Sequence, residues 1–394
     1  MNSKVFFCLF ILALSAIGCV SEFKADLPYN DEQILIVDGN IMENTEAVFY
    51  LSKSFPLDSF FNPQQAFNID ARITIIGSDG YRSLPAIYRG GGKYSIFTEE
   101  LNDNVNYGIE IEYDGDTYRS ALSKPLHTPE IDSISWIQPK REGPVFFRVS
   151  THDNTTEDAK FFFWDYAENW EITPEYYTTY FLNPSTNQFY TLPSAPYYYC
   201  WKSNVSDRFL IGSTEALKEN RIINHQLYQA DHSGYRFTVL YCVTVNQKAI
   251  SKGAYDYYQN KIQLNEETGG LFSPLPSELN GNITCITDPS KRVMGYVEVT
   301  KNVTQKRLFV YPNELSHPIG HSNCNIITND SVLIILSESK GTYADIYWMG
   351  YRPITYLNPY DLETPSEWTI APCTDCLAKG GAKLKPDFWP NDHE

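Results

Sequence analysis

Apolar positions in the first third of this chain fall into short runs that alternate with polar residues or stay apolar for a few positions. Both patterns are typical of β-strands. Turn-forming Gly, Asp and Ser residues separate the runs at the spacing expected of a sandwich. The runs lie at residues 34–37, 73–76, 94–96 and 107–111, and the turns at 78–80, 89–92 and 114–116. We therefore predict an immunoglobulin-like β-sandwich over residues 33–124.

Pro125 and Pro129 predict a linker at residues 125–130, because proline interrupts regular structure. Residues 131–394 then form a larger β-rich domain. Its best helix is expected at 251–266, where Tyr255, Tyr258 and Ile262 have helical spacing. Further strands are predicted at 145–149, 161–166, 293–299, 307–311, 332–336 and 343–348. The predicted fold class is mainly β, a sandwich followed by a larger β-rich domain with one or two helices.

The N-terminus has a different pattern, an apolar run of residues 5–17 that follows Lys4 and ends at Gly18 and Cys19. This arrangement is typical of a secretory signal peptide and is too short for a permanent membrane span. A cysteine after the cleavage point indicates a bacterial lipoprotein, with residues 1–18 removed, Cys19 lipidated and 19–32 forming a tether. The alternative is ordinary secretion, with Cys19 as a structural cysteine.

Composition narrows the choice of partners. The formal net charge of −17 argues against nucleic acid as a ligand, because binding to phosphates requires a basic surface. Aromatic residues make up 15% of the chain and include 29 Tyr, which suits half-buried strands. Faces that bind sugars or peptides use the same residues, so both interpretations stay open.

The densest aromatic segment lies at residues 176–201 and is too broken by Pro and Asn for one strand. It predicts a long ordered excursion. Its aromatic side chains either form a surface for a ligand or partner, or pack inward beneath the loop. The candidate binding residues are Tyr176, Tyr177, Tyr180, Phe189, Tyr190, Tyr197, Tyr198 and Trp201.

Six cysteines follow Cys19, and an even number in an exported protein indicates disulfides. The sequence leaves their pairing open. One pair forms a CxxC motif, but it lacks the context of a redox or zinc site. The candidate disulfide cysteines are Cys200, Cys242, Cys285, Cys324, Cys373 and Cys376.

Catalytic motifs are weak throughout. Ser337 and Lys340 match an SxxK pattern but follow a run that predicts a strand and lack partner motifs. His317, His321 and Cys324 have ligand-like spacing, but Pro and Gly between the histidines disfavour a helix. We expect no enzyme activity, no metal site and no cofactor, with a hydrolase site visible only in three dimensions as an alternative.

Several motifs occur in an order that resembles a known family. They are CWKS at 200–203, LIGST at 210–214, AYDYY at 254–258, ETGGLF at 267–272, CTDC at 373–376 and PDFW at 386–389. Together they resemble Bacteroidota outer-membrane lipoproteins of unknown function that are encoded beside TonB-dependent receptors. The resemblance spans residues 34–389 and brings no catalytic residues.

The resemblance implies an accessory lipoprotein of the outer membrane that binds a ligand, or docks on a TonB-dependent receptor, for nutrient uptake. The ligand would be a glycan, a peptide or another nutrient. The alternative is a structural or adhesive envelope lipoprotein that binds glycans or proteins without transport. Glu22, Lys24 and Asp26 only partly match a surface-export signal, which leaves the leaflet open, with the cell surface favoured.

Overall fold

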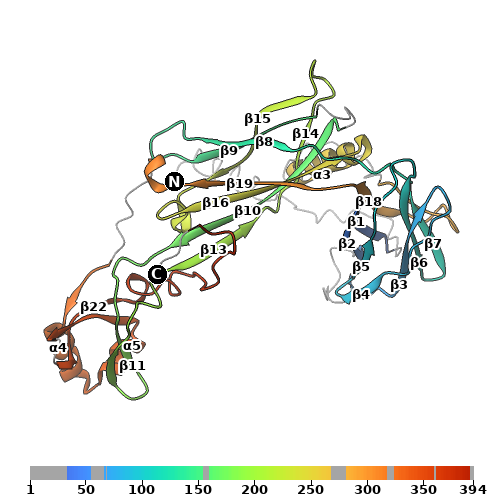
Figure 1. Ribbon diagram of the computed structural model, residues 1–394. Coiled ribbons are helices and arrows are strands. Elements are labelled where there is room, and N and C mark those ends of the chain that lie inside the picture. Colours follow the sequence, from blue (N-terminus) through green and yellow to red (C-terminus); the bar gives the residue numbers. More distant parts are fainter. Residues whose placement is uncertain are drawn as a thin grey trace, which may run out of the picture.

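The computed structural model describes residues 33–54, 66–67, 69–153, 159–267, 281–316, 324–358 and 361–390. The molecule is elongated and has three parts, an N-terminal sandwich, a middle domain and a small C-terminal module (Figure 1). In Figure 1 the sandwich lies at the right and the module at the lower left, with the middle domain between them. Within the described residues, every helix is too short or too polar to cross a membrane.

The N-terminal sandwich consists of two sheets with an apolar core between them. Val37, Phe49 and Ile109 are fully buried in this core. The first sheet has the order β18 (Val293–Thr300), β1 (Leu35–Met42), β2 (Thr45–Lys53), β5 (Lys93–Thr98) and β4 (Ile87–Gly90). The second has the order β17 (Ile283–Cys285), β7 (Asp116–Ser120), β6 (Tyr107–Tyr113) and β3 (Ala71–Gly77).

Two of these strands come from far along the chain. Strand β18 pairs in parallel with β1, and β17 pairs with β7. The prediction that residues 33–124 form the complete sandwich was therefore wrong, because the domain also takes residues 283–300. Local patterns identify a strand but not its partner, since pairing depends on which segments the rest of the fold brings together.

The middle domain packs two further sheets against each other. Phe147 of one sheet stacks on Tyr241 of the other with ring centres 5.4 Å apart. The larger sheet contains β13 (Cys200–Val205), β10 (Phe161–Ile172), β16 (Tyr241–Ile250), β19 (Thr304–Val310) and β14 (Leu210–Ser213). The smaller contains β15 (Arg221–Ala230), β9 (Val145–His152) and β8 (Ile131–Ile137), and a short 3-10 turn, η1 (Ser233–Tyr235), follows β15.

Helix α3 (Lys252–Glu267) covers the end of the middle domain and confirms the helix predicted at 251–266. Tyr255 and Tyr258 pack on Phe161 and Phe163, each pair with ring centres 5.1 Å apart. The predicted helical spacing of the tyrosines therefore reflects packing against β10.

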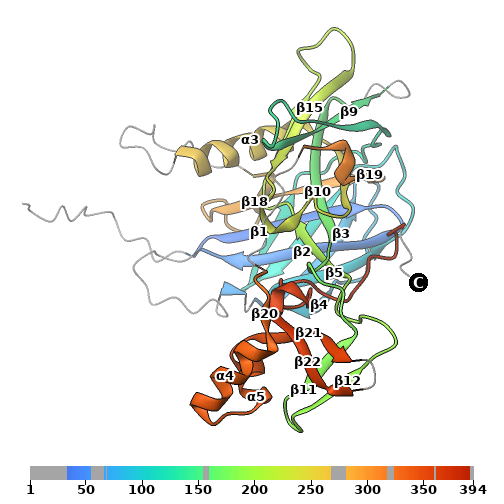
Figure 2. The same cartoon turned by 90° about the vertical axis from the view of Figure 1, so that its left-hand side faces the viewer.

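The C-terminal module contains a three-stranded sheet, a hairpin and two helices, and lies apart from both sandwiches at the bottom of Figure 2. Trp368 is fully buried at its centre and packs with Leu182, Val332 and Ile346. The elements are β20 (Ile327–Thr328), β22 (Asp361–Ile370), β21 (Tyr351–Asn358), β11 (Tyr180–Asn183), β12 (Gln188–Thr191), α4 (Asn329–Ser339) and α5 (Tyr343–Trp348). Two 3-10 turns, η2 (Pro312–Glu314) and η3 (Ala371–Cys373), lie before β20 and after β22 in sequence.

The strands predicted at 332–336 and 343–348 were wrong, because both segments are helices. Thr328 caps α4 by accepting a hydrogen bond from the backbone N–H of Ser331. Val332 faces the core while the next three apolar residues are exposed. A short apolar run does not distinguish strand from helix, so the cap and the burial pattern decide it.

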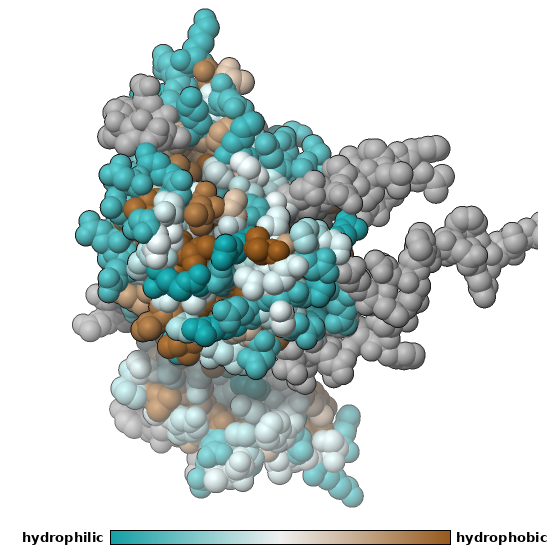
Figure 3. All heavy atoms as spheres, turned by 90° about the vertical axis from the view of Figure 1, so that its right-hand side faces the viewer, coloured by the Kyte–Doolittle hydropathy of each residue, from teal (hydrophilic) through white to brown (hydrophobic). Residues whose placement is uncertain are grey.

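The other predicted strands at 34–37, 73–76, 94–96, 107–111, 145–149, 161–166, 293–299 and 307–311 all coincide with strands of the structure, apart from end residues. The mainly β fold class is confirmed, with three α-helices among the described residues. Seen from the sandwich end, the surface is largely hydrophilic, with small hydrophobic groups between the polar areas (Figure 3).

Candidate binding site

The aromatic segment predicted as an excursion forms the β11–β12 hairpin and its flanks, and its side chains divide between core and surface. Tyr180 is 1% exposed, and Phe189 packs edge-on against Trp368. Tyr177 and Tyr190 are 58% and 41% exposed. Inward packing is thus observed for part of the segment, and other side chains are exposed, because strand alternation within the hairpin turns successive side chains to opposite faces. That the exposed side chains bind a ligand or partner stays a prediction.

A hollow of about 270 Å³ lies between this hairpin, helix α5 and the start of β21. Three of the predicted binding residues, Tyr180, Tyr190 and Tyr197, line it. The other lining residues are Thr178, Phe181, Leu182, Tyr347, Arg352, Pro353, Thr374, Asp375 and Leu377. Its wall is therefore mostly aromatic and apolar, with one cation and one anion, the composition of small-ligand sites.

The remaining predicted binding residues lie elsewhere. The hydroxyl of Tyr176 donates to the backbone carbonyl of Cys324 at 3.3 Å. Tyr177 and Tyr198 pack edge to face outside the hollow, with ring centres 5.1 Å apart. Trp201 is buried in the middle domain beside Trp389. Phe189 belongs to the core of the C-terminal module.

Arg352 is the main residue of the hollow that the sequence analysis missed. Its Nη1 donates to the backbone carbonyls of Tyr347 and Tyr351 at 2.9 and 2.8 Å. Its guanidinium lies 3.5 Å from the centre of the Tyr347 ring, a cation–π contact. Burial lowers the pKa of Arg352, and Tyr347 and Asp375 oppose this effect. Tyr347 and Pro353 are near Arg352 in sequence, but Tyr180, Tyr190 and Tyr197 reach the hollow from a distant segment, so no local motif marks this arginine as part of a site.

The two disulfides hold one wall of the hollow. Cys373 is bonded to Cys324, and Cys376 is bonded to Cys200. Thr374 and Asp375, which line the hollow, lie between the two bonded positions. The two cysteines of the CxxC motif therefore do not pair with each other. Each is bonded to a different distant cysteine, which fixes the segment between them at both ends.

The prediction of disulfides is confirmed for four cysteines and was wrong for Cys242 and Cys285, which are free buried thiols. Cys242 lies in β16 of the middle domain and Cys285 in β17 of the N-terminal sandwich. Because each is enclosed in a different core, neither thiol has another cysteine of the described residues within bonding reach. Burial raises the pKa of Cys242 to about 11.

Of the two weak catalytic motifs, only the SxxK pattern lies wholly within the described residues. Ser337 lies near the C-terminal end of α4, where its hydroxyl donates to the backbone carbonyl of Ile334, and Lys340 caps the helix. His317 and His321 lie outside the described residues, and Cys324 is consumed in a disulfide. Within the described part of the chain, no three His, Cys, Asp or Glu residues cluster as metal ligands would.

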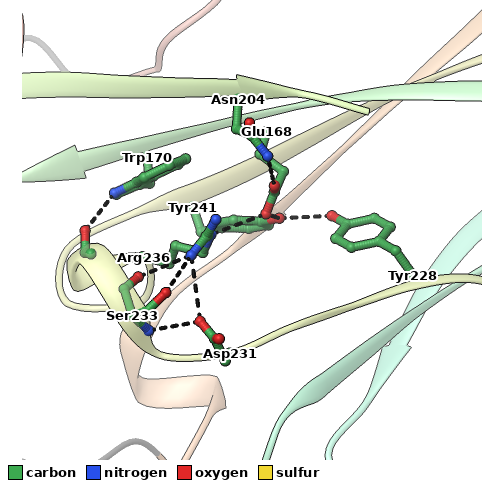
Figure 4. Close-up of polar contacts among 9 residues, drawn as sticks. Glu168, Trp170, Asn204, Tyr228, Asp231, Ser233, Arg236 and Tyr241 are labelled. Carbon is green, nitrogen blue, oxygen red and sulfur yellow. Dashed lines mark hydrogen bonds and ion pairs between the residues drawn. The ribbon is translucent and has the colours of Figure 1, made fainter. Parts of the chain in front are cut away.

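A second polar cluster surrounds Glu168 in the middle domain (Figure 4). Its carboxylate accepts hydrogen bonds from the Tyr241 hydroxyl at 2.7 Å and from Asn204 at 2.8 Å, and pairs with Arg236 at 3.2 Å. Arg236 also stacks on Trp170. Both carboxylate oxygens are engaged by protein groups, so this cluster ties β10 to β13, β16 and the turn after β15 and serves the fold.

Residues 20–307 match the family model described as "Domain of unknown function (DUF4249)". The match covers most of the chain, so the protein belongs to this family. It ends before α4, so Tyr347, Arg352 and Asp375 lie beyond the matched range.

No curated protein matches the chain. A solved structure that resembles part of it is the two-domain fibronectin type III segment from chicken tenascin. That structure is 12% identical and covers 55% of this chain and 91% of its own, with a TM-score of 0.15. At that score it adds nothing to the strand topology described above.

Proposed function

We propose that this protein is an outer-membrane lipoprotein of Bacteroidota that binds a small ligand in the hollow of its C-terminal module and docks on a TonB-dependent receptor for nutrient uptake. The observation that carries the proposal is the aromatic hollow, whose wall is held between two disulfides. A wall held in this way is organised before the ligand arrives, which reduces the entropy lost on binding.

The anchoring part of the proposal rests on the sequence around Cys19. Disulfides persist in oxidising compartments, which suits a protein exported across the inner membrane. The first described residue, Gln33, follows Cys19 by 14 positions, so an extended tether could place β1 up to about 50 Å from the membrane surface. In Figure 1, β1 and the C-terminal module lie at opposite ends of the molecule.

The docking part rests on exposed apolar side chains of α4 and α5. Ile334, Trp348 and Met349 are 60%, 72% and 60% exposed. All three lie on the C-terminal module, and Trp is among the residues most enriched at the centres of protein interfaces. Tyr347, next to Trp348, lines the hollow, so a receptor seated here would border the ligand.

The test is a pull-down of the full lipoprotein from native outer membranes in mild detergent. We expect a TonB-dependent barrel at near-equal ratio, and loss of that barrel in the double variant Ile334→Ser, Trp348→Ser. Ile223→Ser is the matched control, because Ile223 is 67% exposed on β15 of the middle domain. If the lipoprotein is recovered as a monomer without a partner, the receptor role is rejected, and a free-standing envelope lipoprotein that binds glycans or proteins is favoured.

A further inference from the structure

The Nη1 group of the Arg352 guanidinium is hydrogen-bonded to the protein, whereas the edge formed by Nε and Nη2 has no acceptor among the described residues. Both hydrogens of Nη1 are used by the carbonyls of Tyr347 and Tyr351. The donors on Nε and Nη2 make no hydrogen bond or ion pair with the described residues. Those two groups point the same way and have the spacing of the two oxygens of a carboxylate.

The setting of this edge favours an anionic ligand group. The Tyr347 ring holds the guanidinium plane, so little rotational freedom remains to be lost on binding. The guanidinium is half-buried and lines the hollow. Asp375 lines the same hollow, but its Oδ1 already accepts the backbone N–H of Leu377 at 2.8 Å, and its charge acts on Arg352 without a direct ion pair between them.

The rest of the hollow favours an apolar body beside that group. Tyr180, Tyr190 and Tyr197 supply flat aromatic faces, and Leu182 and Leu377 supply aliphatic contact. Because Arg352 lines this wall and its Nε and Nη2 donors are left without protein acceptors among the described residues, we propose that the hollow binds a carboxylate whose carbon skeleton is aromatic or aliphatic, with Arg352 as the residue that receives the carboxylate. This inference rests on the proposed ligand-binding function and names its ligand class.

The experiment compares two probes of equal shape on the purified full chain, N-acetyl-L-phenylalanine and its neutral amide, by isothermal titration and NMR. We expect the acid to bind at least about tenfold more tightly, the worth of one charge-assisted bidentate contact. In the Arg352→Gln variant, the acid should bind only as tightly as the amide. In the Arg352→Lys variant, the affinity for the acid should lie between those of the parent and Arg352→Gln, since lysine keeps the charge but cannot make the bidentate contact.

Asp375→Asn supplies a test that does not remove the arginine. Loss of the nearby negative charge should increase the affinity for the acid and leave the affinity for the amide unchanged. Arg307→Gln is the matched control, because Arg307 also stacks on an aromatic ring, that of Phe388, in the middle domain. Equal affinity for acid and amide, no binding of either, or weaker acid binding in Asp375→Asn would overturn the inference. The assay contains no membrane, so its outcome is independent of the receptor pull-down.

Discussion

The carboxylate of Glu298 accepts two hydrogen bonds from Ser251, one from the side-chain hydroxyl at 2.6 Å and one from the backbone N–H at 3.1 Å. Glu298 lies in β18 of the N-terminal sandwich, and Ser251 directly precedes α3 of the middle domain. The Tyr296 hydroxyl lies 3.1 Å from the same serine oxygen. A buried acid therefore ties the first domain to the start of the helix that covers the second.

This contact makes stability depend on pH. Burial raises the pKa of Glu298 from 4.5 to about 7, and the Ser251 hydrogen bonds oppose the shift only in part. Between those two values the folded state holds a proton that the unfolded state has lost, so the free energy of unfolding falls as pH rises. The fall from this group amounts to about 3 kcal/mol in total.

Urea unfolding at pH 5 and pH 8 measures the effect. Glu298→Gln should remove this group's contribution to the pH dependence of the free energy of unfolding, because an amide does not ionise. Glu338→Gln changes an exposed residue near the end of α4 and should leave the slope as it is. A Glu298→Gln variant with the pH dependence of the parent would show that the carboxyl is not protonated in the folded state.

Thiol labelling distinguishes the free cysteines after residue 19 from the disulfide-bonded ones. The folded chain should react slowly at Cys242, because a pKa of about 11 leaves on the order of one thiolate in a thousand at pH 8. After unfolding without reductant, peptide mapping should find label on Cys242 and Cys285 and on none of Cys200, Cys324, Cys373 and Cys376. Label on any of those four would contradict the pairing.

Removal of the disulfides should destabilise the chain. The Cys200–Cys376 bond closes a separation of 176 residues and the Cys324–Cys373 bond one of 49. We expect each serine pair to lower the free energy of unfolding by about 3–5 kcal/mol, since both cross-links restrict the unfolded chain. Cys285→Ser should cost less, and the comparison is made by urea unfolding under non-reducing conditions.

Trp368 and Trp348 provide a matched pair in the C-terminal module. Trp368→Ala should cost about 3–5 kcal/mol, because the ring is fully buried and its loss leaves a cavity beside Val332 and Ile346. Trp348→Ala should leave the unfolding transition unchanged and weaken capture of the receptor, because this ring is exposed. Thermal unfolding followed by near-ultraviolet circular dichroism distinguishes them; equal destabilisation would refute the assignment of core and surface.

Gly295 permits the pairing of β18 with β1. Its φ is +127°, and a Cβ there would lie 1.7 Å from the backbone carbonyl oxygen of Val37. Gly295→Ala should therefore detach β18 and lower the thermal midpoint sharply. Gly115→Ala is the control, because Gly115 also has positive φ, +81°, but open space around it, so only the backbone strain of about 1 kcal/mol applies. Similar midpoints for the two variants would argue against the close approach.

Local patterns were sufficient for most strands and for α3, because alternation and helical spacing record which face of an element is buried. They failed at 332–336 and 343–348, where short apolar runs fit either structure and the Thr328 cap and the packing around Trp368 decided the outcome. They also located the aromatic segment that supplies part of the hollow.

The sequence by itself determined the mainly β character, the position of the Tyr-rich segment and the presence of structural disulfides, since these depend on residue type and near-neighbour spacing. Only the tertiary structure decided that residues 283–300 complete the first sandwich, that Cys373 and Cys376 bond to different partners, and that Arg352 faces the same hollow as Tyr180. Each of these joins segments far apart in the chain, and such contacts depend on how whole domains pack.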